Sequence, residues 1–246
     1  MEQKSWLINK KNGVYFLTPP SSDFEDAYTA IRNKEKRLLT DENVLLLPHS
    51  KINQNEWKKR IWTLNQFEEY LTKKRFESIL DIGCGNGWFT SRLSKHAETV
   101  IGLDVGVTEL EQAARCFCHE KCTFICCSNW KEIPEKTFDC ITFNGSAHYF
   151  DTNAEFWESL YRLLKPGGEI HLLDSPIYEA KEREFAKERS SKYFKEMGVP
   201  KAANFYKQIV WKDLPTNKKI RYRPNRFLNK LFNHRSPFPW ICIYKP

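Results

Sequence analysis

The chain has 246 residues, a formal net charge of +8, 41% apolar residues and eight cysteines. This length suits one domain, or one domain with a terminal extension. No run of about 18 apolar residues is present, which excludes a membrane-spanning helix. The first residues lead into no apolar segment of the kind that a secretory signal contains, so we expect a cytoplasmic protein without membrane partners.

The N-terminal stretch is expected to precede the main domain as a separate element. Residues 1–22 are polar and end in a Pro-Pro pair followed by serines, and a helix is expected from about residue 23. We assign residues 1–56 to an N-terminal helical extension or cap, and residues 57–246 to the main domain. This domain opens with a helix, because apolar residues recur there at spacings of three and four: Trp57, Ile61, Leu64, Phe67 and Leu71.

The rest of the chain is organised around the stretch from Ser78 to Phe89. An apolar run meets three glycines at alternating positions, Gly83, Gly85 and Gly87, and a helix-compatible segment follows. This order predicts a buried parallel strand, a sharp turn and the start of a helix. Alternating glycines let the main chain turn tightly and let a ligand lie against it, and the first N–H groups of the helix suit an anion.

Two common nucleotide-binding patterns do not fit this turn. A dinucleotide-binding fold requires glycine or alanine at the position where this chain has Trp88. A phosphate-binding P-loop requires Gly-Lys-Ser/Thr, which is absent. The pattern that is present reads Asp-x-Gly-x-Gly-x-Gly and begins at Asp81.

Two further motifs follow in the chain. Residues 99–105 predict a second strand that ends in Asp104, roughly 20 residues past the glycines, the offset at which an acid meets a ribose in related folds. Residues 163–174 contain a Lys-Pro-Gly-Gly turn that leads into another strand. Together the three motifs resemble those of class I S-adenosylmethionine (SAM)-dependent methyltransferases, and the resemblance covers roughly residues 57–246.

This resemblance implies the fold and the cofactor. The expected fold is a doubly wound α/β domain, with a mostly parallel seven-stranded sheet, helices on both faces and an antiparallel terminal hairpin. The cofactor would be SAM and the product S-adenosylhomocysteine. Because such enzymes commonly insert substrate-binding elements between the fifth and sixth strands, we expect a lid over about residues 176–215.

The resemblance also implies which residues bind SAM. The loop from 83 to 87 would contact its amino-acid end, Asp104 its ribose and Val105 its adenine. Ser128 or Asn129 would take the place of the acid that often contacts the adenine. Arg60 would pair with the methionine carboxylate, and Asn144 would orient the cofactor. The full expected set is Arg60, Asp81, Gly83, Cys84, Gly85, Gly87, Asp104, Val105, Ser128, Asn129 and Asn144.

One residue is a candidate for catalysis. His148 follows the fourth predicted strand, where a general base could act on the acceptor. The alternative is a histidine that hydrogen-bonds the cofactor or caps the next helix.

The cysteines are not expected to bind a metal. Five of them lie close together, yet they contain no C-x₂-C pair and match no zinc spacing. We expect Cys122, Cys126 and Cys127 to pack as small apolar residues in or beside the third strand, and we expect no disulfides. The five are Cys116, Cys118, Cys122, Cys126 and Cys127.

Three functions stay open. Methyl transfer to a small molecule, at O, N or C, is favoured because the predicted lid is aromatic and the chain lacks the Asn/Asp-Pro-Pro-Tyr and Pro-Cys motifs of nucleobase methyltransferases. Methyl transfer to RNA or a ribosomal component is an alternative, because residues 218–235 contain seven basic residues and no acid. A SAM-binding protein without turnover is a third, since a fold alone does not prove catalysis.

Overall fold

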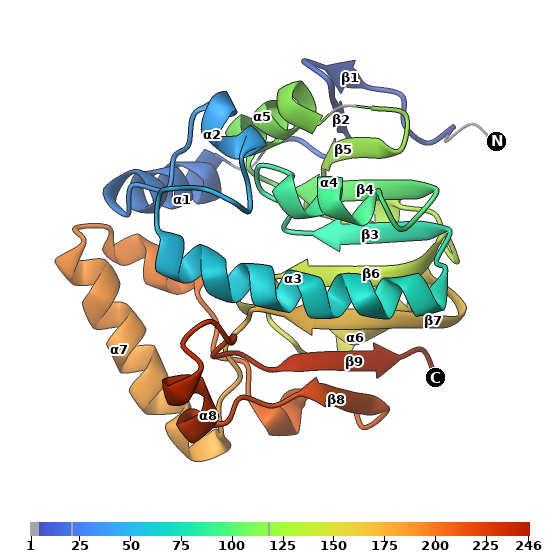
Figure 1. Ribbon diagram of the computed structural model, residues 1–246. Helices are drawn as coiled ribbons and strands as arrows, with labels where there is room; N and C mark the ends of the chain where they lie inside the picture. Colours follow the sequence, from blue (N-terminus) through green and yellow to red (C-terminus); the bar gives the residue numbers. More distant parts are fainter. Residues whose placement is uncertain (1–4, 21, 118) are drawn as a thin grey trace.

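A nine-stranded sheet runs through the described part of the chain, which comprises residues 5–20, 22–117 and 119–246 of the computed structural model (Figure 1). In the order in which they lie side by side, its strands are β1 (Lys10–Lys11), β2 (Val14–Phe16), β5 (Cys122–Cys126), β4 (Thr99–Asp104), β3 (Ser78–Ile82), β6 (Phe138–Asn144), β7 (Leu164–Leu173), β9 (Trp240–Tyr244) and β8 (Lys218–Tyr222).

The sheet is mostly parallel, as predicted. Strands β2, β5, β4, β3, β6 and β7 all pair in parallel. Strand β9 is antiparallel to both β7 and β8, which confirms the terminal hairpin. Strand β3 lies between β4 and β6, so the strand order reverses beside it, and ligands of doubly wound folds bind at such a point.

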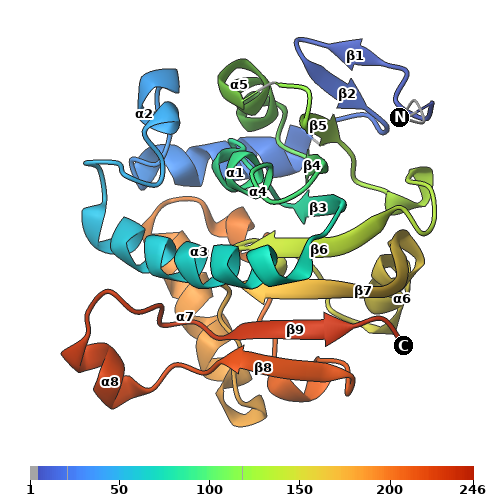
Figure 2. The ribbon, with the colours of Figure 1, turned by 45° about the vertical axis from the view of Figure 1, so that its right-hand side comes forward.

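The prediction of seven strands was wrong by two, because the N-terminal segment adds a hairpin to the sheet. Strands β1 and β2 flank Asn12 and Gly13, both of which have positive φ, at 49° and 84°. An Asn-Gly pair favours a tight two-residue hairpin turn. Strand β2 then pairs with β5 and covers the hydrogen-bonding groups that an edge strand would expose (Figure 2). The division of the chain at residues 56 and 57 stays a prediction.

The helices and 3-10 turns connect these strands. The helices are α1 (Ser22–Lys34), α2 (Asp41–Leu45), α3 (Gln54–Lys74), α4 (Trp88–Leu93), α5 (Val107–Phe117), α6 (Ala154–Leu163), α7 (Arg183–Glu196) and α8 (Arg226–Leu231). The turns are η1 (Trp130–Glu132), η2 (Ala147–Tyr149), η3 (Ala180–Glu182), η4 (Pro200–Phe205) and η5 (Trp211–Asp213).

Helices pack on both faces of the sheet. The predicted stripe of α3 is confirmed, because Leu64, Phe67 and Leu71 are buried and pack with Ile79 and with α4 on one face. The next residue of β3, Leu80, points to the other face, where it packs with the apolar side of α6. This alternation follows from the two-residue period of a strand. It leaves the ends of the parallel strands free to form a site.

The parallel strands β3, β6 and β7 end at the left of Figure 1, where α1 and α7 also lie. Segments far apart in the sequence therefore meet over the same edge of the sheet. Tyr193 of α7 donates to Glu35, just after α1, with 2.6 Å between the two oxygens.

Gly87 provides a test of how the glycine turn is packed. It has φ 76°, and an added Cβ would lie 2.7 Å from Cβ of Ala113 and 2.8 Å from the ring of Phe124. Gly87→Ala should therefore combine backbone strain with overpacking and lower the free energy of unfolding by roughly 2–5 kcal/mol, measured by urea denaturation.

Gly167→Ala is the matched control. Gly167 also has positive φ, at 75°, but no described atom lies within 4 Å of its added Cβ. Only the backbone strain should remain, at about 1–2 kcal/mol. Equal losses in the two variants would contradict the packing described here.

Candidate active site

A cavity of about 930 Å³ lies at the carboxyl ends of β3, β4, β6 and β7. Its floor is formed by the loops that follow these strands, and its walls include residues of α1, the start of α3 and α7. This volume is at the upper end of the range of about 300–1,000 Å³ that ligand pockets occupy. The cavity is therefore large enough for more than one small ligand.

The cavity brings together most of the residues that were predicted to bind SAM. The predicted residues that line it are Arg60, Gly83, Cys84, Gly85, Asp104, Val105, Ser128 and Asn144, together with His148. Asp81, Gly87 and Asn129 are not part of its lining.

The glycine turn lies against the ends of two neighbouring strands. The N–H groups of Gly83 and Cys84 donate to the carbonyl oxygen of Leu103, at 2.8 and 3.1 Å. A Cβ on Gly83 would lie only 2.4 Å from Cβ of Ser146, in the loop after β6. Only glycine fits there, and the main chain of the turn is consequently exposed to the cavity rather than covered by a side chain.

The carboxylate of Asp104 fixes this turn from the neighbouring strand. Its Oδ2 accepts from the N–H of Gly85 at 2.8 Å, and its Oδ1 accepts from the N–H groups of Val105 and Gly106, at 2.7 and 3.0 Å. Burial raises the pKa of this carboxyl, while the three N–H donors favour its charged form. Three lone-pair positions are thus used, and the remaining one can accept a hydroxyl from a ligand in the cavity.

Asp81 supports the turn from beneath. It is buried, and its two oxygens accept from the hydroxyls of Thr90, at 2.7 Å, and Thr142, at 2.9 Å. Burial raises the pKa of Asp81 to about 6. The side chain connects β3, α4 and β6, which is a positioning role rather than a contact with the cavity.

Two side chains, at the end of β6 and just after it, have buried polar atoms without a partner among the described residues. These atoms are Oδ1 of Asn144 and Nδ1 of His148. Burial, with a smaller contribution from the nearby positive charge of Arg60, lowers the pKa of His148 to about 3. The imidazole is therefore neutral near pH 7 and faces the cavity as a hydrogen-bonding group.

Arg60 lies on the first turns of α3 and reaches the same part of the cavity. Its Nε donates to Glu56, four residues earlier, at 3.1 Å, and its guanidinium lies 5.3 Å from the ring centre of Trp57. A Cβ on Gly145 would lie 3.5 Å from its Nη2. The guanidinium is thus held beside the loop that carries Asn144, with donors left for an anionic group.

Of the two residues that were predicted to contact the adenine, only Ser128 lines the cavity. The N–H of Ser128 donates to the hydroxyl of Thr18 at 2.9 Å. Asn129 instead caps η1, where its side-chain oxygen accepts from the N–H of Lys131 at 3.2 Å. Trp130 lines the cavity as well.

The sequence analysis missed several residues of the site. Asp174, at the end of β7, lines the cavity, and so do Tyr28 and Arg32 of α1 and Tyr149 and Tyr206. The one available signal was an acid at the end of a predicted strand, because Asp174 occupies the same kind of position as Asp104. The tyrosines and Arg32 come from segments whose packing depends on contacts distant in sequence.

Cys122, Cys126 and Cys127 are buried in or beside β5. Cys118 lies outside the described residues. These three side chains pack as the sequence analysis expected, since Cys122 and Cys126 belong to the apolar cluster between α5 and the sheet.

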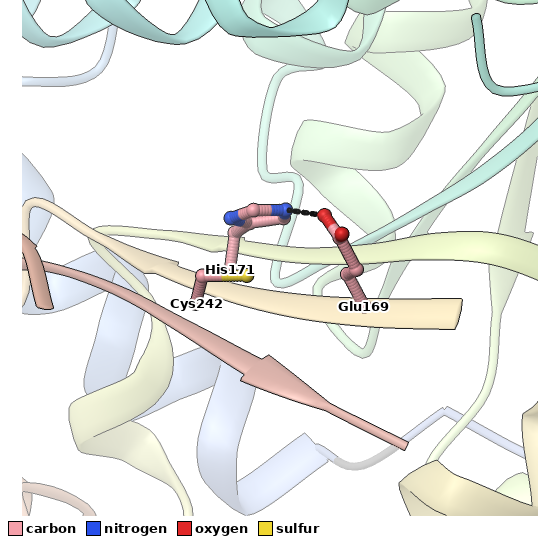
Figure 3. Close-up of side chains that lie close together, drawn as sticks. All are labelled: Glu169, His171 and Cys242. Carbon is pink, nitrogen blue, oxygen red and sulfur yellow. Dashed lines mark hydrogen bonds and ion pairs between the residues drawn. The ribbon is translucent and has the colours of Figure 1, made fainter. Parts of the chain in front are cut away.

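A different group, Glu169, His171 and Cys242, is close enough to hold a metal ion (Figure 3). However, Nδ1 of His171 accepts from the indole N–H of Trp240 at 3.1 Å, which leaves Nε2 to donate to Glu169 at 3.2 Å. Glu169 also accepts from the hydroxyl of Tyr70 and from Lys74. Both nitrogens of His171 are thus occupied, and the group is a buried hydrogen-bond network rather than a metal centre.

None of the helices in the described ranges is both long and apolar enough to cross a membrane.

Comparison with known proteins shows what this chain resembles. Residues 80–172 match the model of a methyltransferase domain. Phosphoethanolamine N-methyltransferase 3 of Arabidopsis thaliana is 28% identical over 117 residues, which are 46% of this chain and 24% of that protein. The tRNA U34 carboxymethyltransferase of Pseudoalteromonas atlantica is 27% identical over 131 residues, 52% of this chain and 40% of that protein.

The chain thus spans about a quarter of the first of these relatives and less than half of the second. Among solved structures, a phosphoethanolamine N-methyltransferase 2 of Haemonchus contortus, with S-adenosylhomocysteine bound, has a TM-score of 0.51 and 15% identity. That alignment covers 93% of this chain and 62% of the other, and it shows a shared fold. The match over residues 80–172 and the shared fold support a class I methyltransferase domain that binds SAM.

Proposed function

We propose that this chain transfers the methyl group of SAM to a small-molecule acceptor bound in the same cavity. The observation that carries the proposal is that one cavity has two different walls. We call the glycine turn and Asp104 the first wall, and the polar and aromatic lining residues that include His148 and Tyr149 the second wall. A cofactor on the first wall would leave the second for an acceptor.

The proposed cofactor residues follow from their positions. The main chain at Gly83, Cys84 and Gly85 would hold the amino-acid end, and Arg60 would pair with its carboxylate. The orphaned oxygen of Asn144 suits the ammonium group at that end.

The remaining contacts concern the nucleoside. Asp104 would accept from the ribose, while Val105 and Ser128 would contact the adenine. Asp81 and Gly87 support the turn, and Asn129, which caps η1, is left out of the set.

For methyl transfer, the main task of the protein is to align the acceptor with the methyl group of SAM. Bound SAM supplies an electrophilic methyl group on a sulfonium. The chain's own residues then hold the acceptor in line and exclude water, and such positioning can contribute roughly 7–11 kcal/mol in favourable cases. We assign His148 to the acceptor wall as a neutral group that accepts or donates a hydrogen bond at the acceptor.

Phosphoethanolamine is the first acceptor to test. The names of the relatives motivate this choice, and the cavity walls also carry Arg32, Lys36 and Arg189, which suit an anionic substituent on the acceptor.

RNA is the second candidate, supported by the tRNA-modifying relative and by the basic stretch 218–235. Two cations of this stretch have partners within the protein, because Lys218 donates to the carbonyl oxygen of Pro215 at 2.7 Å and Arg221 donates to the hydroxyls of Tyr70 and Tyr244. This weakens the case for a continuous basic surface. Binding of RNA that falls steeply with added salt would favour this candidate.

The first prediction concerns turnover. The purified protein, incubated with SAM and phosphoethanolamine, should form S-adenosylhomocysteine and an acceptor heavier by one methyl group for each transfer, as measured by mass spectrometry. Screening a panel of small amines, alcohols and acids in the same assay extends the test. SAM binding without transfer to any small molecule or to RNA would instead favour the non-catalytic function.

The second prediction concerns the ribose carboxylate. Asp104→Asn removes the charge that would accept from the ribose and that holds the glycine turn, so the Kd for SAM should rise roughly 10–150-fold, measured by calorimetry. Asp139→Asn is the control, because Asp139 supports the start of β3 through Ser78 and lies outside the cavity. Equal effects on the Kd would contradict the assignment of Asp104.

The third prediction concerns pH and follows from the neutral state of His148. The pKa of His148 is about 3 in the folded chain and 6.5 in the unfolded chain. Between these pH values His148 is therefore neutral in the folded chain and protonated in the unfolded chain. This residue therefore destabilises the fold as the pH falls below about 6.5, by up to about 1.4 kcal/mol per pH unit.

His148→Gln lacks this effect. The difference in unfolding free energy between wild type and variant, measured by urea denaturation from pH 7 to pH 5, should shift in favour of the variant as the pH falls. A difference that does not change with pH would show that His148 is not held neutral by burial.

A further inference from the structure

Asp174 is a buried carboxylate beside the cavity, and one of its oxygens has no partner in the described part of the chain. It follows β7, and the residue is 9% exposed. Its Oδ1 accepts from the hydroxyls of Thr63, at 2.7 Å, and Ser236, at 2.9 Å. Its Oδ2 is buried and has no partner in the described part of the chain, although Asp174 lines the cavity. A buried oxygen of this kind requires a donor, and a ligand can supply it.

The backbone holds this carboxylate in an unusual conformation. Asp174 has φ 47°, in the left-handed region that few residues other than glycine adopt. The donors on Oδ1 come from α3 and from the segment before β9, and the carbonyl oxygen of the preceding Leu173 accepts from Gly145 at 2.9 Å. Contacts from three separate segments thus determine where Oδ2 points.

Two further unpartnered atoms belong to the same wall. Oδ1 of Asn144, at the end of the neighbouring strand β6, and Nδ1 of His148, just after that strand, are buried, and both residues line the same cavity. When the carboxyl of Asp174 is ionised, its oxygens accept hydrogen bonds and cannot donate them, and the same holds for the amide oxygen of Asn144. Since Oδ1 of Asn144 is assigned to the ammonium group of the cofactor, Oδ2 of Asp174 and Nδ1 of His148 remain for the acceptor. Together they suit a ligand that brings more than one hydrogen-bond donor.

We propose that the methyl acceptor is an amine nitrogen and that Asp174 binds it through Oδ2. This inference rests on the proposed function and names the class of its acceptor. An amine brings two or three N–H donors, whereas a hydroxyl brings one and a carbon nucleophile brings none. Arg60 is close enough to favour the charged form of Asp174 against the effect of burial, which raises the pKa of this carboxyl.

The charge that develops during the reaction also favours a carboxylate at the position of Asp174. The lone pair of the neutral amine forms the new N–C bond, the electron pair of the broken C–S bond goes to sulfur, and the positive charge passes from sulfur to nitrogen. The product is an ammonium ion with its proton count unchanged. A fixed carboxylate beside the nitrogen stabilises the charge that develops there.

Binding of matched ligands tests this proposal without turnover. The protein, saturated with S-adenosylhomocysteine, is titrated by calorimetry with two pairs that differ only in amine against hydroxyl: phosphoethanolamine against 2-hydroxyethyl phosphate, and ethanolamine against ethylene glycol. Wild type should bind the amine of at least one pair roughly tenfold or more tightly than the alcohol. Asp174→Asn keeps the shape and an acceptor for Thr63 and Ser236, and should lose this preference.

The controls separate the possible failures. Asp174→Asn should bind S-adenosylhomocysteine as wild type does, which also shows that it is folded, and Asp139→Asn should keep the preference for the amine. Wild type that binds no amine at millimolar concentration, or that prefers the alcohol, would overturn the proposal. An Asp174→Asn variant that binds S-adenosylhomocysteine weakly would also overturn it, by assigning Oδ2 to the cofactor. Wild type that does not bind S-adenosylhomocysteine would instead count against the proposed function itself.

Discussion

The close packing of the turn after β3 between the ends of β4 and β6 is the constraint on which the site depends. The turn is held to β4 by the bonds of Gly83 and Cys84 to Leu103 and of Gly85 to Asp104. It is held to β6 by the hydroxyl of Ser146, which donates to Ile82 at 2.5 Å. Because the turn approaches β6 so closely, it exposes main chain to the cavity and brings the loop after β6 alongside. Asp104 and Asn144 reach the same cavity for this reason.

The opposite wall is assembled from segments that are remote in the sequence. Helix α1 and helix α7 meet over the strand ends through the bond between Tyr193 and Glu35 and through Lys34, which donates to the carbonyl oxygen of Met197. Arg32 of α1 pairs with Glu109 of α5 at 3.2 Å, and a Cβ on Gly85 would lie 3.1 Å from that carboxylate. Helix α1 is therefore connected through Glu109 to the glycine turn.

The parts of the fold that depend on local pattern could be predicted from the sequence. The stripe of α3, the strand–turn–helix at Ser78–Phe89 and the acid at the end of β4 all have local signals, because periodicity and glycine spacing express them within about 20 residues. The hairpin at Asn12 and Gly13 also had a local signal, the Asn-Gly pair, but residues 1–22 are polar and were assigned to the N-terminal extension.

The remaining residues of the site could not be predicted in this way. Ser128 and Asn129 are adjacent and chemically similar, and only the capping of η1 shows which of them turns away from the cavity. Asp174 depends on Thr63 and Ser236, which lie 111 and 62 residues away in the sequence. Its role is set by tertiary contacts and by an unusual backbone conformation, neither of which leaves a pattern among neighbouring residues.

A crystal structure of the protein with S-adenosylhomocysteine would test the central claim, that one cavity holds a cofactor and an acceptor on different walls. The account predicts that the ligand lies along the glycine turn with its ribose on Asp104. A space bounded by His148 and Asp174 would then remain for the acceptor. A ligand whose amino group binds Asp174, or one that fills the cavity and leaves no such space, would contradict it.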